Sequence, residues 1–198
     1  MRRIAPIAAM CAVAAFGAGC AAPPSHFYIL SPTATPTATP ATVAEVSVVV
    51  GPVSIPTLVD VPQIVVSASP NEVSLDEFNR WASPLQNNIS RVVAEDLVAM
   101  LGTPHVSQFQ QSLNVNADYR VAIEVQVFES APGEAATLNA AWIVRRTKDG
   151  KAQTGRTTVR EPTLDKGYAA LAAAHSRALA RLSQDVADAV RALDRAAP

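Results

Sequence analysis

Apolar residues recur at helical spacing in two long segments of this 198-residue chain. The first runs from Leu85 to Leu101, and the order Ser83-Pro84-Leu85-Gln86 favours a helix start with Ser83 as the N-cap. Gly102 and Pro104 end this segment. The second segment runs from Asp165 to Leu193. Because polar residues fill the positions between the apolar ones, both segments are predicted to be amphipathic helices.

Alternating apolar and polar positions predict strands in much of the remaining chain. The expected strands cover 27–30, 46–50, 63–67, 106–109, 119–129, 138–146 and 152–160. Asp149-Gly150 predicts a two-residue hairpin turn, which makes the last three strands an antiparallel meander. Gly51-Pro52 interrupts the 46–50 strand. The nearby prolines favour a sheet edge or bend for the 46–50 and 63–67 segments. The element order indicates one α/β domain over 44–195, with a mixed sheet of about five to six strands and two helices.

The first nineteen residues have the pattern of a signal peptide. Arg2 and Arg3 precede an uncharged stretch, 4–19, that is shorter than the roughly 20 apolar residues needed to span a bilayer. Gly17-Ala18-Gly19-Cys20 resembles the lipobox of bacterial lipoprotein precursors. That resemblance implies cleavage before Cys20, with a diacylglyceryl group and an N-acyl chain, such as palmitate, on the cysteine. An ordinary secretory leader that leaves Cys20 unmodified is the alternative.

Residues 20–43 are expected to connect the lipid to the folded domain. Ser31–Thr42 reads SPTATPTATPAT, with no charge and no apolar periodicity, and is typical of a spacer. Ala21 follows the cysteine directly, where an aspartate would favour retention at the inner membrane, so the periplasmic face of the outer membrane is expected.

Composition and charge exclude several classes of function. Sixteen basic and seventeen acidic residues give a net charge of −1, so there is no electrostatic footprint for nucleic acid. The chain lacks nucleophile-elbow, phosphate-loop and metalloprotease motifs, and His26, His105 and His175 lack ligand spacing. Asp76-Glu77 is expected just before a helix, and Glu95-Asp96 on a solvated helical surface. A non-catalytic protein without a metal or other cofactor is therefore predicted.

A family resemblance rests on longer, ordered motifs. These are Val50-Gly51-Pro52-Val53-Ser54-Ile55-Pro56, Asp60-Val61-Pro62-Gln63-Ile64-Val65, Phe78-Asn79-Arg80-Trp81-Ala82-Ser83-Pro84-Leu85 and Ile89-Ser90-Arg91-Val92. With Phe27-Tyr28-Ile29-Leu30 before them, they resemble the PqiC (YmbA-type) lipoproteins, the ABC-type transport auxiliary lipoproteins. The resemblance implies an outer-membrane lipoprotein that partners an MCE-domain protein in lipid transport and supports envelope integrity. It also implies assembly of copies into a ring.

The motifs are concentrated in two short segments, the Ile55–Ile64 loop and Asn79-Arg80-Trp81, that are candidates for a partner or self-association surface. The candidate residues are Ile55, Pro56, Asp60, Pro62, Arg80 and Trp81. For Trp81, packing at the helix entrance is favoured over a role as a binding anchor. A periplasmic lipid-binding module and an auxiliary lipoprotein of another ABC transporter are alternative functions, and an envelope hydrolase is a more distant one.

Overall fold

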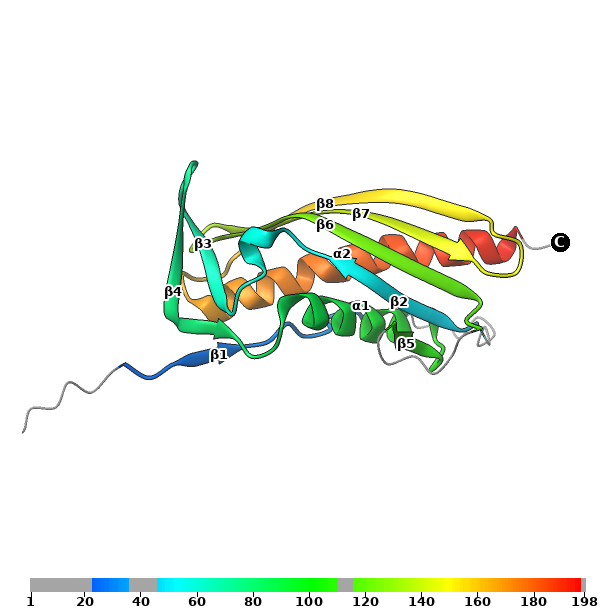
Figure 1. Ribbon diagram of the computed structural model, residues 1–198, viewed down its shortest axis with the longest axis horizontal. Coiled ribbons are helices and arrows are strands. Elements are labelled where there is room, and N and C mark those ends of the chain that lie inside the picture. Colours follow the sequence, from blue (N-terminus) through cyan, green and yellow to red (C-terminus); the bar gives the residue numbers. More distant parts are fainter. Residues whose placement is uncertain (1–22, 36–45, 110–115, 197–198) are drawn as a thin grey trace, which may run out of the picture.

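The computed structural model describes residues 23–35, 46–109 and 116–196, and within these it is a mixed α/β domain (Figure 1). The signal peptide, Cys20 and residues 36–42 of the Pro/Thr segment lie outside the described residues. The elements, in chain order, are β1 (His26–Tyr28), β2 (Val48–Ser54), a 3₁₀ turn (Thr57–Val59), β3 (Gln63–Ser69), β4 (Glu72–Trp81), α1 (Leu85–Leu101), β5 (Val106–Gln108), β6 (Tyr119–Ala131), β7 (Ala135–Arg146), β8 (Ala152–Pro162) and α2 (Tyr168–Arg195).

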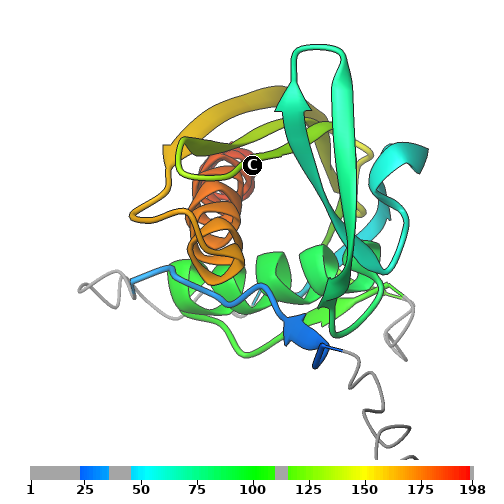
Figure 2. The same ribbon diagram turned by 90° about the vertical axis from the view of Figure 1, so that its left-hand side faces the viewer.

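The described strands form two sheets rather than one. The larger has the order β5-β2-β6-β7-β8, and the smaller has the order β1-β4-β3. β2 pairs in parallel with β5 and β6, whereas β6, β7 and β8 form the predicted antiparallel meander. The two long helices were also predicted correctly. Both pack against the concave side of the larger sheet, and the smaller sheet stands at one end of the molecule (Figures 1 and 2).

The smaller sheet contains a strand that the sequence pattern did not predict. β4 is exposed along most of its length on both faces, so it lacks a clean alternation of apolar and polar residues. Asp76 and Glu77 therefore lie within a strand, and the expectation that they immediately precede a helix was wrong. β3 forms an edge of this sheet, as its flanking prolines predicted.

β2 differs from the expectation for the 46–50 segment in two ways. It continues through Gly51 and Pro52, and it lies between β5 and β6 instead of at an edge. β5 pairs only with Val48–Val50, so Pro52 lies beyond the end of that ladder and its missing N–H costs no hydrogen bond there. The pairing with β6 shifts register between Val50 and Val53, and this bulge accommodates Gly51 at a φ of 126°.

Two local predictions about turns and caps were wrong. Ser83 does not cap α1: Pro84 has a non-helical ψ of 128° and occupies the N-cap position, with no side-chain hydrogen bond to the first turn. The β7–β8 connection has five residues, 147–151, instead of a two-residue turn. The Arg146 N–H donates to the Lys151 carbonyl, and Asp149 binds the Arg146 side chain. Gly102 does end α1 in the left-handed conformation, as its position predicted.

Candidate anchoring and docking surfaces

The first described segment of the chain is attached to the domain at both of its ends. β1 pairs in parallel with β4, and the Tyr28 carbonyl accepts the Ala82 N–H at 2.8 Å. Residues 29–35, called the strap here, then run across α1 and α2. Leu30 is fully buried in the core, and the Ser31 N–H donates to Ser176 Oγ at 3.1 Å. The first residues of the predicted spacer are therefore bound to the domain.

A buried carboxylate holds the other end of the strap. Asp96 Oδ1 accepts the backbone N–H groups of Thr33 at 3.1 Å and Ala34 at 3.0 Å, and Ser183 donates to Oδ2 at 3.1 Å. Asp96 is fully buried, so its predicted place on a solvated surface was wrong. Burial raises its pKa above the usual range, whereas the three hydrogen bonds act in the opposite direction. We call Asp96, Ser176 and Ser183 the clasp.

The burial of Asp96 was not predicted from the sequence, although helix geometry places it on the buried face of α1. Asp96 lies four residues after Val92 and four before Met100, so it shares the buried face of α1 with both. A carboxylate on such a face requires hydrogen-bond donors from another segment. The sequence does not show that the donors come from the Pro/Thr segment.

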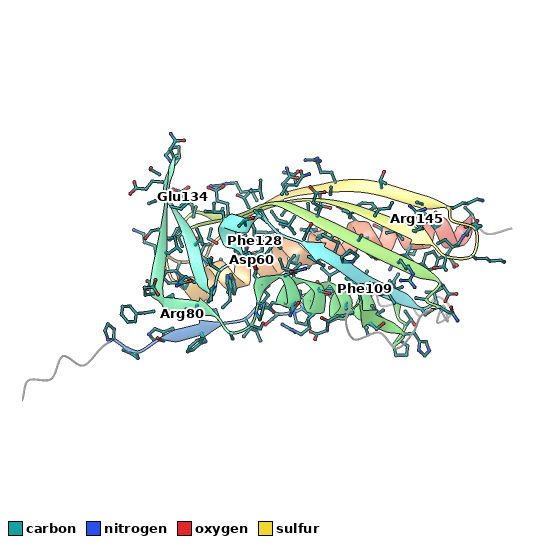
Figure 3. The ribbon with its side chains drawn as sticks, in the orientation of Figure 1. Asp60, Arg80, Phe109, Phe128, Glu134 and Arg145 are labelled. Atoms are coloured by element: carbon teal, nitrogen blue, oxygen red, sulfur yellow. The ribbon has the colours of Figure 1, made fainter. Side chains whose placement is uncertain are left out.

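The two predicted docking segments meet where the two sheets join. Residues 55–62 connect β2 to β3, and 80–81 end β4. The Trp81 N–H donates to the Pro62 carbonyl at 2.8 Å, and Gln63 pairs with Arg80 in the ladder. A hollow of about 340 Å³ between them is lined by Asp60, Val61, Pro62 and 81–85. We call 55–62 and 80–85 together the corner; Figure 3 labels Asp60 and Arg80.

The corner residues differ in what they present to solvent. Trp81 is only 6% exposed and meets Phe128 edge-on with ring centroids 6.3 Å apart, so its ring belongs to the core. Ile55 and Pro56 are half-buried, whereas Asp60 and Pro62 are exposed. Leu58, in the 3₁₀ turn between them, is 57% exposed. Leu58 was not among the predicted residues, although an apolar residue in a loop between two prolines is a signal for it.

Arg80 is held within its own strand. Its Nη2 lies 2.8 Å from Glu77 Oε2, and its Nε donates to the Glu77 carbonyl at 2.8 Å. Hydrogen bonds from Gln63 and Arg80 lower the pKa of Glu77 below its usual range, so the carboxylate is ionised at neutral pH. The guanidinium is thus fixed at the rim of the corner.

An open groove of about 910 Å³ is lined by residues of β1, the strap and α2. Phe27 and Ile29 form part of one side, and small residues of α2, including Ala173 and Ala180, form part of the other. Phe27 is 63% exposed and Ile29 is 53% exposed. The end of the domain that carries β1 therefore presents apolar side chains to solvent.

Ser130 and His175 form a buried pair. Ser130 Oγ lies 2.8 Å from His175 Nε2, and the imidazole stacks on Phe128 at 3.8 Å. Burial lowers the pKa of His175 to about 3, so the ring is neutral at physiological pH. Both residues are buried, so the pair serves packing rather than an open site.

Two further kinds of feature are absent from the described ranges. Residues 23–35, 46–109 and 116–196 hold no group of three or more His, Cys, Asp or Glu side chains placed to bind a metal ion. In the same ranges, no helix has both the length and the apolar character needed to cross a membrane.

The structure is thus an α/β domain whose two helices bind the N-terminal strap. The chain belongs to the family described as the ABC-type transport auxiliary lipoprotein component, whose model matches residues 28–187. It is a lipoprotein of the cell envelope and an accessory component of a transport system. The expected family is thereby confirmed.

Two solved structures show the same fold. Protein XCC0632 from Xanthomonas campestris, of the family DUF330, is 22% identical over 86% of this chain and 98% of its own, with a TM-score of 0.70. An uncharacterized protein is 17% identical over 85% of this chain and 99% of its own, with a TM-score of 0.69. No curated protein matches the chain.

Proposed function

We propose that this protein is a non-catalytic subunit of an MCE-type lipid transport system, anchored to the periplasmic face of the outer membrane through Cys20. The corner is the observation that carries the docking role. Segments 55–62 and 80–85 are separated in sequence, yet they line one hollow to which Asp60 and Pro62 contribute. The exposed Leu58 lies in the 3₁₀ turn of the first segment. An apolar side chain with polar residues around it is the usual composition of a protein-docking surface.

The anchor and the strap give the docking surface a defined position. A diacylglyceryl group and an N-acyl chain on Cys20 together provide the two or more chains needed for stable membrane attachment. The strap is attached to both helices through the clasp, so a pull on the anchor is transmitted to the core. The domain would thus be presented to an MCE-domain partner, or to neighbouring copies in a ring, in a fixed orientation.

The test compares two exposed apolar residues, one inside the corner and one outside it. Leu58→Asp should abolish co-purification of the lipidated full chain with its MCE-domain partner and leave the melting temperature unchanged. Val98→Asp, on the exposed side of α1, is the matched control and should retain the partner. Mass measurement of each complex reports whether copies also assemble into a ring. Equal partner retention by the two variants would contradict docking at the corner.

A further inference from the structure

Four exposed apolar side chains lie on segments at one end of the molecule. Phe27 is on β1, Ile29 begins the strap, Phe78 is on β4, and Leu164 lies in the loop before α2. These segments gather around the end that faces the viewer in Figure 2. Exposed apolar side chains on neighbouring segments are typical of a surface that contacts a membrane or another protein.

A hydrogen-bonded network fixes β1, β4 and the start of α2 relative to one another. Tyr28 of β1 donates to Asn79 Oδ1 at 2.8 Å, and Asn79 donates to Asp76 Oδ2 at 2.8 Å. Tyr168, the first residue of α2, donates to the same Asp76 oxygen at 3.1 Å, and its ring centroid lies 6.0 Å from that of Tyr28. The backbone that carries the apolar side chains is thus already ordered. Little backbone conformational entropy is therefore lost when these side chains enter another phase.

The length of the tether indicates what that phase is. Phe27 lies seven positions after Cys20, with residues 21–26 between them. Even fully extended, these residues span only about 25 Å. Acyl chains on Cys20 would therefore keep Phe27 and Ile29 next to the lipid headgroups, at a high effective concentration.

The charges at this end are mixed in sign. Asp76, Glu77 and Asp165 lie on the same segments as Arg80 and Lys166. Glu161, Arg177 and Arg181 line the groove beside Phe27 and Ile29. An end without an excess of basic residues gains little from anionic lipids. Contact would depend on the transfer of apolar surface out of water.

We propose that this end lies against the bilayer, with Phe27 and Ile29 inserted among zwitterionic lipid headgroups. This proposal rests on lipidation of Cys20, as set out under the proposed function. It assigns to β1 and the start of the strap a second, non-covalent membrane contact. The long axis of α2 then points away from the membrane (Figure 1).

The test uses single fluorescent labels, because a chain cleaved before Cys20 has no other cysteine. Ile29→Cys places an environment-sensitive fluorophore at the proposed contact, and Lys151→Cys places it in the β7–β8 turn at the opposite end. The lipidated proteins are reconstituted in phosphatidylcholine vesicles. At position 29 we expect quenching by nitroxide-labelled lipid and protection from aqueous iodide, and at position 151 the reverse. Adding Phe27→Ser to Ile29→Cys should restore iodide access.

Each other outcome overturns the proposal in a recognisable way. Iodide access at 29 equal to that at 151, in protein that floats with the vesicles, contradicts the contact but leaves the anchor intact. Protection from iodide without quenching by nitroxide lipid indicates a protein contact instead. Protection that requires phosphatidylglycerol indicates electrostatic attraction. Protein that does not float has no lipid anchor, and the proposed function then fails together with the contact.

Discussion

Asp96 Oδ1 lies 3.0 Å from the backbone nitrogen of Ala34, a residue 62 positions earlier in the chain. The same oxygen accepts the Thr33 N–H, and Oδ2 accepts the Ser183 hydroxyl. One carboxylate on α1 therefore joins the strap to both helices. This arrangement makes the strap part of the folded domain rather than a flexible linker.

Removing this carboxylate should release the strap. Asp96→Ala leaves two backbone N–H groups and one hydroxyl without acceptors, and we expect a loss of about 2–4 kcal/mol in the free energy of unfolding. Amide hydrogen exchange at Thr33 and Ala34 should become fast. Urea unfolding and exchange mass spectrometry measure the two effects.

The adjacent Glu95 provides the control. It is exposed and pairs with Arg91 at 2.9 Å, so Glu95→Ala should cost less than about 1 kcal/mol and leave exchange in the strap unchanged. Similar exchange rates at Thr33 and Ala34 in the two variants would mean that Asp96 does not hold the strap.

Acid should destabilise the domain through His175. Its pKa is about 3 in the folded chain and 6.5 when unperturbed, so unfolding takes up a proton between these values. The free energy of unfolding therefore falls as the pH drops below 6.5, by about 2 kcal/mol between pH 7 and pH 5. Urea titrations at these two pH values measure the loss.

Replacing the imidazole should remove this dependence. In His175→Gln, the free energy of unfolding should be nearly equal at pH 7 and pH 5, although lower than that of the parent at pH 7. His105→Gln changes an exposed histidine and should retain the parental loss on acidification. A His175→Gln variant as acid-sensitive as the parent would assign the effect to other groups.

The fold could be predicted wherever one face of an element is buried. In α1 the apolar residues from Leu85 to Met100 lie on one buried face. In β6 the alternation of apolar and polar residues likewise indicates one side that faces the core. β4 could not be predicted because neither of its faces is covered for most of its length. The division into two sheets is a consequence of that exposed hairpin, which no local pattern specifies.

The two candidate segments could be chosen from the sequence, but the orientation of their side chains could not. The structure places 55–62 beside 80–85, since the Trp81 N–H donates to the Pro62 carbonyl. They did not show that the Trp81 ring points into the core while Leu58 points outward. The orientation of the Trp81 side chain depends on the bulges between β3 and β4. Tertiary packing sets the register of such a bulged ladder.

Trp81 and Arg80 should accordingly respond differently to truncation. Trp81→Ala removes a buried ring and should lower the free energy of unfolding by about 3–5 kcal/mol. Arg80→Ala breaks a partly exposed ion pair and should cost less than about 1 kcal/mol. Chemical denaturation separates the two, and equal losses would contradict a core role for the Trp81 ring.

Gly155 should be intolerant of any side chain because of Trp142. The two residues pair across β7 and β8, and a Cβ at position 155 would overlap the six-membered ring of the indole. The indole is also fixed by its Nε1–H, which donates to Thr157 Oγ1 at 3.1 Å. Gly155→Ala should therefore lower the free energy of unfolding by about 1–3 kcal/mol through overpacking.

A double-mutant cycle distinguishes overlap with the ring from a backbone effect. Trp142→Leu removes the overlapping ring, so adding Gly155→Ala to it should cost much less than in the parent, because β8 is otherwise suited to a residue with a Cβ. Urea unfolding of all four proteins gives the coupling energy. If the two losses are additive, the backbone of β8 is what requires glycine at position 155. A favourable coupling of about 1 kcal/mol or more would show that the indole ring of Trp142 excludes a side chain there.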